Sequence, residues 1–202
     1  ALPAGIISAV KRQKAADYGA MIFALLGISI PEFWFGIMLI LTFALWVPIL
    51  PSMGFMSPFQ DFFGSLKFLV LPAIALGLRM AGVVTRMTRS SMLDELGQDY
   101  VRTARSKGLS ERAVIFIHTL KNALIPTVTI VGLQFGTILG GSVVIEMVFS
   151  WPGVGQLIIN SILTRDYLVV QAAILLLAVF FLFVNLVVDF VYTLLNPRVE
   201  LT

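Results

Sequence analysis

The sequence predicts an all-α integral membrane protein. We expect a helical bundle with four full transmembrane helices, the tail of another at the N-terminus, and one helical cytoplasmic loop. Of the 202 residues, 58% are hydrophobic and 12% are charged, whereas soluble domains average roughly 25% charged residues. The mean hydropathy is +0.97, too high for a soluble domain on one anchor. We interpret residues 1–202 as a single membrane domain.

The apolar runs decide between the two kinds of membrane protein. They are continuous and reach the ~20 residues that a helix needs to cross a bilayer. An outer-membrane barrel would instead show alternating segments of ~10 residues. The runs therefore favour membrane-spanning helices and exclude a barrel.

The N-terminal part of the chain is predicted to hold one full span. Residues 1–10 have the composition of the end of a span, and a basic cluster follows at residues 11–14. The first full span is predicted at residues 18–46, where Pro31 should cause a tilt or a kink because the run is long. Residues 47–67, rich in proline and glycine, form the first external loop.

Three further spans follow. They are predicted at residues 68–87, 125–149 and 168–195. An external segment at residues 150–167 separates the last two spans and opens with the turn Trp-Pro-Gly. Apolar residues at helical spacing after this turn predict a short helix at the membrane surface.

Positive charge divides unevenly between the two sides of this topology. Lys67 and Arg165 fall outside and Arg79 lies within a span, while the other eleven Lys and Arg residues fall on the cytoplasmic side. Cytoplasmic segments carry an excess of Lys and Arg. The N-terminal basic segment, the loop at residues 91–124 and the C-terminus are therefore predicted to be cytoplasmic. The same bias explains the net charge of +3 without a nucleic-acid partner.

The long polar interval between the second and third full spans is predicted to begin with a helix over residues 94–107. Asp94 and Glu95 supply an acidic first turn, and the last turn is basic. Gly108 stands where a C-cap glycine belongs. This part of the loop is therefore expected to be rigid.

A second helix is predicted directly after this glycine. Ser110 can cap its N-terminus, with Glu111 in the first turn. The helix should run toward Ala123, and Pro126 marks the start of the next span. Two helices would then meet at a glycine hinge, a shape better suited to docking a soluble partner than to catalysis.

Residues typical of catalytic or metal sites are scarce in this sequence. Cysteine is absent, which excludes disulfides and thiolate metal sites, and His118 is the only histidine. Phosphate-binding loops and common hydrolase motifs are absent too. We predict that the chain is not an enzyme and binds neither a metal nor a cofactor itself.

Three glycines lie on one face of the third span. Gly132, Gly136 and Gly140 recur every four residues, and such small residues let two helices approach closely. The approaching helix belongs either to the same chain or to a second subunit.

Polar residues mark another part of the same span. Thr127 and Gln134 stack on one face, and Thr137 and Ser142 lie at its flanks. In lipid such groups need water or bonded neighbours. They are predicted either to border an aqueous translocation pathway or to bond to adjacent helices.

Four ionisable residues lie within or near the spans, namely Glu32, Arg79, Glu146 and Asp189. A charge at the bilayer centre costs at least ~2.5–3.5 kcal/mol on insertion scales, so each should face protein or water. Glu146 and Asp189 lie close enough to the span ends for solvation at the interface. Arg79 lies deepest, and we predict either that it faces the pathway or that it pairs with an acid from another helix.

A family resemblance joins these observations. The segment RTARSKGLSERAVIFIHTLKNALIP resembles the cytoplasmic loop of bacterial ABC-transporter inner-membrane permeases, with its pattern Glu-Ala-Ala–x3–Gly–x9–Ile–x–Leu-Pro. The next span, the Trp-Pro-Gly-Val-Gly turn and the Asn-Pro-Arg close follow in the order of the dipeptide/oligopeptide/nickel importer family. Ala104 takes the place of the second alanine and Gly108 that of the glycine. Arg102 and Thr103 stand where the general motif has glutamate and alanine. Such permeases typically have six spans.

The resemblance implies a role in coupling, because in that family the loop forms a short coupling helix that docks into a groove of a cytoplasmic ATPase. The chain would be the permease subunit of an ATP-driven importer in the bacterial inner membrane. It would carry small peptides or a related solute, such as a nickel chelate or a glutathione-like molecule. The residues assigned to coupling are Arg102, Thr103, Ala104, Arg105, Lys107, Gly108, Leu109 and Ser110.

The resemblance also implies partners. These are a homologous second permease subunit, two ATPase subunits that bind the ATP and Mg²⁺, and an extracytoplasmic substrate-binding protein. The residues alone leave open whether the permease pairs with a homologue or with itself.

Two other classes of function are compatible with a polytopic protein. A self-contained channel or ion-coupled secondary transporter should show several paired acids in broken midplane helices, and few are visible here. A membrane scaffold without transport would not need the polar face at Thr127 and Gln134.

Overall fold

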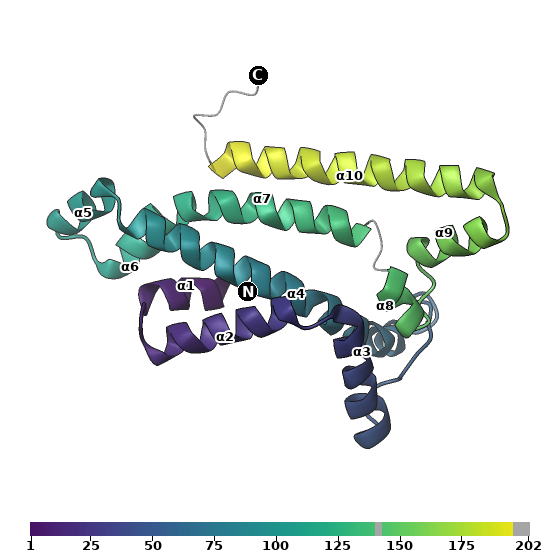
Figure 1. Ribbon diagram of the computed structural model, residues 1–202. Coiled ribbons are helices and arrows are strands. Elements are labelled where there is room, and N and C mark those ends of the chain that lie inside the picture. Colours follow the sequence, from purple (N-terminus) through teal and green to yellow (C-terminus); the bar gives the residue numbers. More distant parts are fainter. Residues whose placement is uncertain (140–142, 196–202) are drawn as a thin grey trace. The chain divides into compact units, whose positions relative to one another are not determined.

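The computed structural model describes residues 1–139 and 143–195, and every regular element in those ranges is helical (Figure 1). The predicted all-α class is therefore confirmed. Contacts divide the chain into two compact units. Unit 1 comprises Ala1–Gly27, Met80–Gln134 and Val184–Thr202, and unit 2 comprises Ile28–Arg79 and Phe135–Phe183.

Among the described residues, three helical segments are long and apolar enough to cross a membrane: Phe62–Leu96, Glu111–Gly136 and Tyr167–Val191. A fourth span exists if Ala15–Ser29 and Glu32–Trp46 cross as one broken element. The predicted total of four full spans is reached only when this bent pair is counted.

The predicted first span is broken in two. Helix α2 (Ala15–Ser29) is followed by α3 (Glu32–Ile40) and the π-helical segment η1 (Leu41–Trp46), and the two parts meet at 99°. Pro31 is the N-cap of α3 and has an extended backbone, with φ −61° and ψ 131°. Its ring removes a helical hydrogen bond and disfavours helix in the residue before it. The predicted position of the kink is right, but the result is a sharp bend rather than a tilt.

Helix α4 (Phe62–Leu96) is longer at both ends than the predicted span at residues 68–87. It absorbs Asp94 and Glu95, so the prediction of a separate helix beginning at residue 94 is wrong. The next helix is α5 (Asp99–Ser106), which begins after Gln98 adopts an extended conformation at ψ 151°. Asp99, rather than Asp94, supplies the acidic first turn.

The second loop helix joins the following span without a break at Pro126. Helix α6 (Glu111–Ala113), the π-helical η2 (Val114–Thr119) and α7 (Leu120–Leu139) follow one another directly. Pro126 lies inside α7, so the prediction that it marks the start of the span is wrong. Membrane helices tolerate an internal proline because neighbouring groups satisfy the freed carbonyl.

The predicted span at residues 125–149 is not one helix in the described part of the chain. Helix α7 is followed by α8 (Val143–Val148), and residues 140–142 between them lie outside the described residues. Three other predicted helical segments agree with the structure. Helix α9 (Val154–Leu163) follows the Trp-Pro-Gly turn, α10 (Tyr167–Leu195) covers the last predicted span, and α1 (Leu2–Val10) occupies the N-terminal apolar run.

In unit 1, α1 and α2 form an antiparallel pair (Figure 1). Ala9 of α1, Met92 of α4 and Ala123 of α7 form a buried cluster. A second cluster, formed by Val101, Ala104 and Val114, seats α5 against η2. The core of unit 2 contains Leu39, Ile40, Leu71, Ala75, Ile145 and Phe149.

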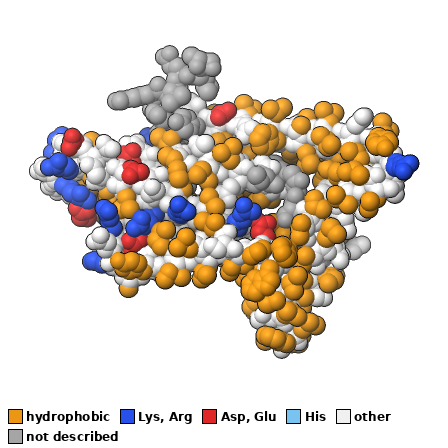
Figure 2. All heavy atoms as spheres, viewed as in Figure 1, with side chains coloured by type: hydrophobic (Ala, Val, Ile, Leu, Met, Phe, Trp, Pro, Cys, Tyr) orange, Lys and Arg blue, Asp and Glu red, His pale blue; other side chains and the backbone are white. Residues whose placement is uncertain are grey.

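Most large apolar side chains lie outside these small cores. The membrane-span window of α10 is 0% buried within the chain. On the face shown in Figure 2, hydrophobic side chains cover α3 and α10, while charged side chains gather over α5 and α6. Apolar exposure on this scale is typical of helices that face lipid or partner subunits.

Candidate functional site: a helical loop and charges within the spans

Apolar side chains of the same chain pack against the inner face of helix α5. Val101 and Ala104 point inward and pack with Val114, and Leu96 at the end of α4 joins them. The side chains of Arg102, Thr103, Arg105, Ser106 and Lys107 are exposed. Ala104, one of the predicted coupling residues, therefore seats the helix, and its neighbours form the outer surface.

A glycine ends α5. Gly108 has a φ of +77°, a left-handed conformation that costs residues with a Cβ atom roughly 1–2 kcal/mol. Its N–H donates to the Arg105 carbonyl at 2.9 Å, and no heavy atom lies within 4 Å of the position that a Cβ would take. The need for glycine at this position is thus a matter of backbone conformation alone.

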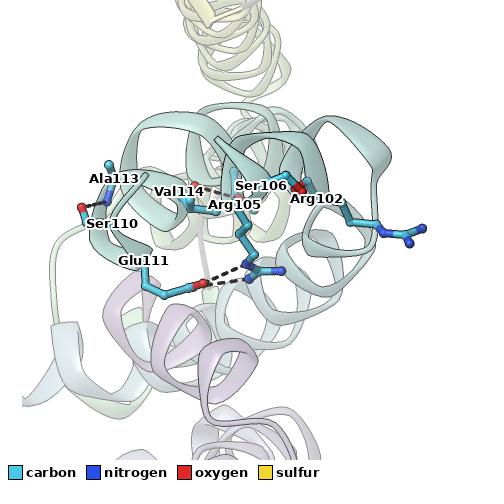
Figure 3. Close-up of polar contacts among 8 residues, drawn as sticks. Arg102, Arg105, Ser106, Ser110, Glu111, Ala113 and Val114 are labelled. Carbon is cyan, nitrogen blue, oxygen red and sulfur yellow. Dashed lines mark hydrogen bonds and ion pairs between the residues drawn. The ribbon is translucent and has the colours of Figure 1, made fainter. Parts of the chain in front are cut away.

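The helix after the glycine has the predicted cap. Ser110 Oγ accepts a hydrogen bond from the Ala113 N–H at 3.4 Å (Figure 3). An ion pair crosses the turn, because Arg105 Nε and Nη2 donate to the two oxygens of Glu111 at 2.9 and 3.4 Å. Both side chains are exposed, so salt screens this pair. The backbone turn at Gly108 therefore sets the angle between α5 and α6, with a small contribution from the exposed pair.

Tyr100 ties the loop to its base, and sequence reasoning did not single it out. Its hydroxyl donates to Glu95 Oε2 at 2.5 Å and accepts from Asn122 Nδ2 at 3.1 Å. Burial, together with the hydrogen bond to Glu95, raises the pKa of the Tyr100 phenol. One side chain of α5 thus connects the end of α4 with the start of α7.

A buried ion pair was also missed. Asp17 of α2 accepts hydrogen bonds from Arg89 Nε at 2.7 Å and from Arg89 Nη2 at 2.9 Å. It also accepts from Ser8 Oγ at 2.5 Å and from the Gln13 N–H at 2.8 Å. The Asp17 side chain is only 4% exposed. One sequence signal existed: Asp17 is the only acid between the N-terminal basic cluster and Glu32.

Arg79 pairs with an acid from another helix. Its Nη1 lies 3.2 Å from Glu32 Oε1 in unit 2, and this is a single contact. The Arg79 side chain is nevertheless 61% exposed within the chain, and that of Glu32 is 25% exposed. Arg79 is therefore paired with an acid and is also accessible from outside the chain.

The other candidate pathway residues are placed differently. Thr127 is 1% exposed and lies 3.4 Å from Thr88 Oγ1 of α4, so it is enclosed by protein in unit 1. Gln134 is half-buried. Thr137 lies in α7 but its side chain is not among those described, and Ser142 lies outside the described residues.

Two of the three glycines predicted to share a helix face lie in α7 and face α10 of the same chain. A Cβ on Gly132 would overlap Val188, and a Cβ on Gly136 would overlap the ring of Phe181. Gly140 lies outside the described residues. Of the two alternatives left by the sequence, the described geometry offers close packing within the chain.

Glu146 organises the turn before α9 in unit 2. Its carboxylate accepts a hydrogen bond from the Gln156 N–H at 2.6 Å, and its carbonyl accepts from the Trp151 N–H at 2.8 Å. A Cβ on Gly153 would overlap this carboxylate. A carboxylate at a helix N-terminus satisfies free N–H groups and favours the helix dipole. Glu146 therefore stabilises this turn by hydrogen bonds, in addition to any contact with solvent at the interface.

Together these features define a polytopic α-helical membrane protein with a rigid helical loop. The sequence profile of the family described as binding-protein-dependent transport system inner membrane component matches residues 1–201. The chain belongs to this family.

Individual relatives agree with that membership. The chain is 47% identical over 219 residues to the di/tripeptide transport system permease protein DppB of Pseudomonas aeruginosa, covering 98% of this chain and 65% of the relative. It is 42% identical over 222 residues to the dipeptide transport system permease protein DppB of Escherichia coli, covering 98% and 66%. It is 46% identical over 199 residues to the glutathione transport system permease protein GsiC of Escherichia coli, covering 98% and 62%. The chain thus spans slightly less than two thirds of the length of these relatives.

Proposed function

We propose that the chain is the permease subunit of an ATP-driven ABC importer and forms half of a translocation pathway. The observation that carries this proposal is the loop formed by α5, Gly108 and α6. It is seated by a small apolar cluster, fixed at its hinge by a positive φ, and polar on its outer surface. Membership in a binding-protein-dependent transport family supports the same function.

The loop supplies a means of coupling. We assign the contact with an ATPase subunit to the exposed residues of the loop, with Ala104 holding α5 in place. Helix α4 leads directly to the base of α5, and α6 continues through η2 into α7. A displacement of the loop would therefore move the ends of two membrane spans, α4 and α7. ATP and Mg²⁺ would be bound by the ATPase subunits. The exposed residues are Arg102, Thr103, Arg105, Lys107, Gly108, Leu109 and Ser110.

The relatives support a peptide-like solute. Their names specify di/tripeptides, dipeptides and glutathione. We therefore assign a short peptide or a closely related molecule as the solute of this chain. The partners would be a homologous second permease, two ATPase subunits and an extracytoplasmic binding protein. The excess of Lys and Arg in the loop at residues 91–124 supports a cytoplasmic position for that loop.

Among the candidate pathway residues, Arg79 has the strongest support, because it is charged, exposed and part of a spanning helix. Gln134, Thr137 and Ser142 stay assigned to the pathway as candidates. The surroundings of Thr127 favour a role in contact between α4 and α7 instead.

The test is reconstitution. The chain is co-expressed with a homologous second permease and two ATPase subunits, purified in mild detergent and placed in liposomes with the binding protein. We expect a stable complex that takes up radiolabelled alanyl-alanine only when ATP is supplied. A homo-oligomer of this chain that moves the peptide without ATP would show that it is a self-contained channel or carrier.

A further inference from the structure

Helix α4 carries two arginines that pair with acids in different ways. Arg89 binds Asp17 through two short hydrogen bonds, and the acid is almost completely buried. Arg79 makes one contact with Glu32, at 3.2 Å, and keeps 61% of its side chain exposed. The geometry of the Asp17–Arg89 pair is that of a buried ion pair that stabilises the fold. The second leaves most of the guanidinium donors available.

Arg79 lies inside the apolar stretch of α4. At 1.5 Å per residue it is about 18 Å from Lys67 and about 10 Å from Arg86, the next cations along the helix. Charges at this depth are disfavoured against lipid and mark substrate paths or proton relays when they occur. The exposed part of the pair must therefore face water, substrate or another subunit.

The acid of the pair stands at the break in the first span. Glu32 is in the first turn of α3, directly after Pro31, where the helical segments meet at 99°. Interrupted backbone at membrane depth is tolerated only where it is buried in protein or lines a water-filled cavity. The pair thus combines a broken helix with two opposite charges within a membrane span.

An apolar cavity of about 270 Å³ adjoins the same stripe of α4. Pro72 and Leu76 line it, and these lie seven and three positions before Arg79, on one helix face. Ile145 and Trp151 also line it, and Glu146 adds a carboxylate to this mostly apolar wall. Apolar walls beside a few placed polar groups are typical of small-molecule sites.

We propose that Arg79 and Glu32 bind the two charged ends of a short peptide as it passes through the permease, an inference that rests on the proposed function. Arg79 would take the carboxylate, because the guanidinium fork matches it with two parallel hydrogen bonds. Glu32 would accept hydrogen bonds from the ammonium group. When the peptide enters, its ends replace the partners that the two side chains give each other, so no charge is left unpaired.

This recognition ignores the side chains of the peptide. Every unblocked dipeptide or tripeptide carries one ammonium and one carboxylate at neutral pH, whatever its side chains. A permease that reads only these ends can pass peptides of many sequences. The adjoining, mostly apolar cavity would receive one side chain, and the Glu146 carboxylate in its lining already accepts a hydrogen bond from the Gln156 N–H.

The test compares charge removal with charge exchange in the reconstituted complex. The variants are Glu32→Gln, Arg79→Gln and the double exchange Glu32→Arg with Arg79→Glu. We expect each single variant to lower alanyl-alanine uptake about tenfold or more, with ATP hydrolysis still stimulated by the binding protein. The double exchange should leave recovery of the complex unchanged and should not restore uptake. Lys67→Gln, which removes an α4 cation outside the apolar stretch, should leave uptake unchanged.

A second measurement determines which peptides the permease itself binds, without the substrate specificity of the binding protein. Saturation-transfer NMR on the purified complex without binding protein should show contact with alanyl-alanine but not with N-acetyl-alanyl-alanine or alanyl-alanine amide. Normal uptake by both single variants would overturn the inference, because the peptide would then need neither charge of the pair. Equal binding of the blocked peptides would overturn it as well. If the unaltered complex takes up no peptide, the proposed function itself fails.

Discussion

Asp17 and Arg89 join α2 to α4 through two hydrogen bonds of 2.7 and 2.9 Å, although the residues lie far apart in the sequence. The same carboxylate binds Ser8 of α1 and the backbone of Gln13 in the turn between α1 and α2. One acid therefore connects three helices and a turn. Of these helices, α4 leads into the α5 loop.

Removing this acid should destabilise the permease strongly. In the Asp17→Asn variant, Arg89 is left with a buried neutral partner, and breaking a buried ion pair on one side costs about 3–5 kcal/mol. We expect the apparent melting temperature of the purified complex to fall by roughly 10 °C. The matched control is Asp99→Asn, which breaks the exposed pair with Arg102 at 3.4 Å and should change stability far less. Equal effects of the two substitutions would contradict a structural role for Asp17.

The approach of α7 to α10 gives a second prediction. In Gly136→Leu the new side chain would overlap the ring of Phe181, so the two helices must separate or repack. We expect a several-fold lower yield of the assembled complex in size-exclusion chromatography. Gly77→Leu on α4 is the control, because no heavy atom lies within 4 Å of its Cβ position. If both variants assemble equally well, close packing at Gly136 is not required.

The predicted orientation can be tested with single cysteines, because residues 1–202 contain none. Ser106→Cys at the end of α5 should react with a membrane-impermeant maleimide only after the cells are opened. Thr164→Cys, directly after α9, should react in intact spheroplasts. Both positions are exposed, so access to the reagent depends on the side of the membrane. The reverse labelling pattern would show that the topology is inverted.

Local signals predicted the parts of the fold that depend on neighbouring residues. The Trp-Pro-Gly turn and the apolar spacing after it located α9, and the uninterrupted apolar run located α10. Gly108 and Ser110 were predicted as helix-end residues, and the structure gives Gly108 a φ of +77° and Ser110 a capping hydrogen bond. A backbone cap involves residues within one or two turns, so the sequence is enough to find it.

Features that depend on contacts between residues far apart in the sequence could not be predicted from local patterns. The Asp17–Arg89 pair joins side chains from helices that the sequence does not place side by side. Local charge favoured the start of a new helix at Asp94. Instead α4 continues to Leu96, whose side chain packs with Val101 and Val114. Pro126 carries a local signal for a helix boundary, yet α7 continues through it. In the last two cases a helix continues through a local signal for a helix boundary.

The most direct measurement compares ATP hydrolysis and peptide uptake in liposomes for two substitutions at Gly108. Valine is strongly disfavoured at a φ of +77°, whereas asparagine tolerates left-handed backbone. Since no heavy atom lies near the Cβ position, the two variants differ through the backbone rather than through contacts. We predict that Gly108→Val stays in the membrane but transports about tenfold less peptide per ATP hydrolysed, while Gly108→Asn remains close to the unaltered protein. Normal uptake and normal stimulation by the binding protein in Gly108→Val would contradict the assignment of this loop to coupling.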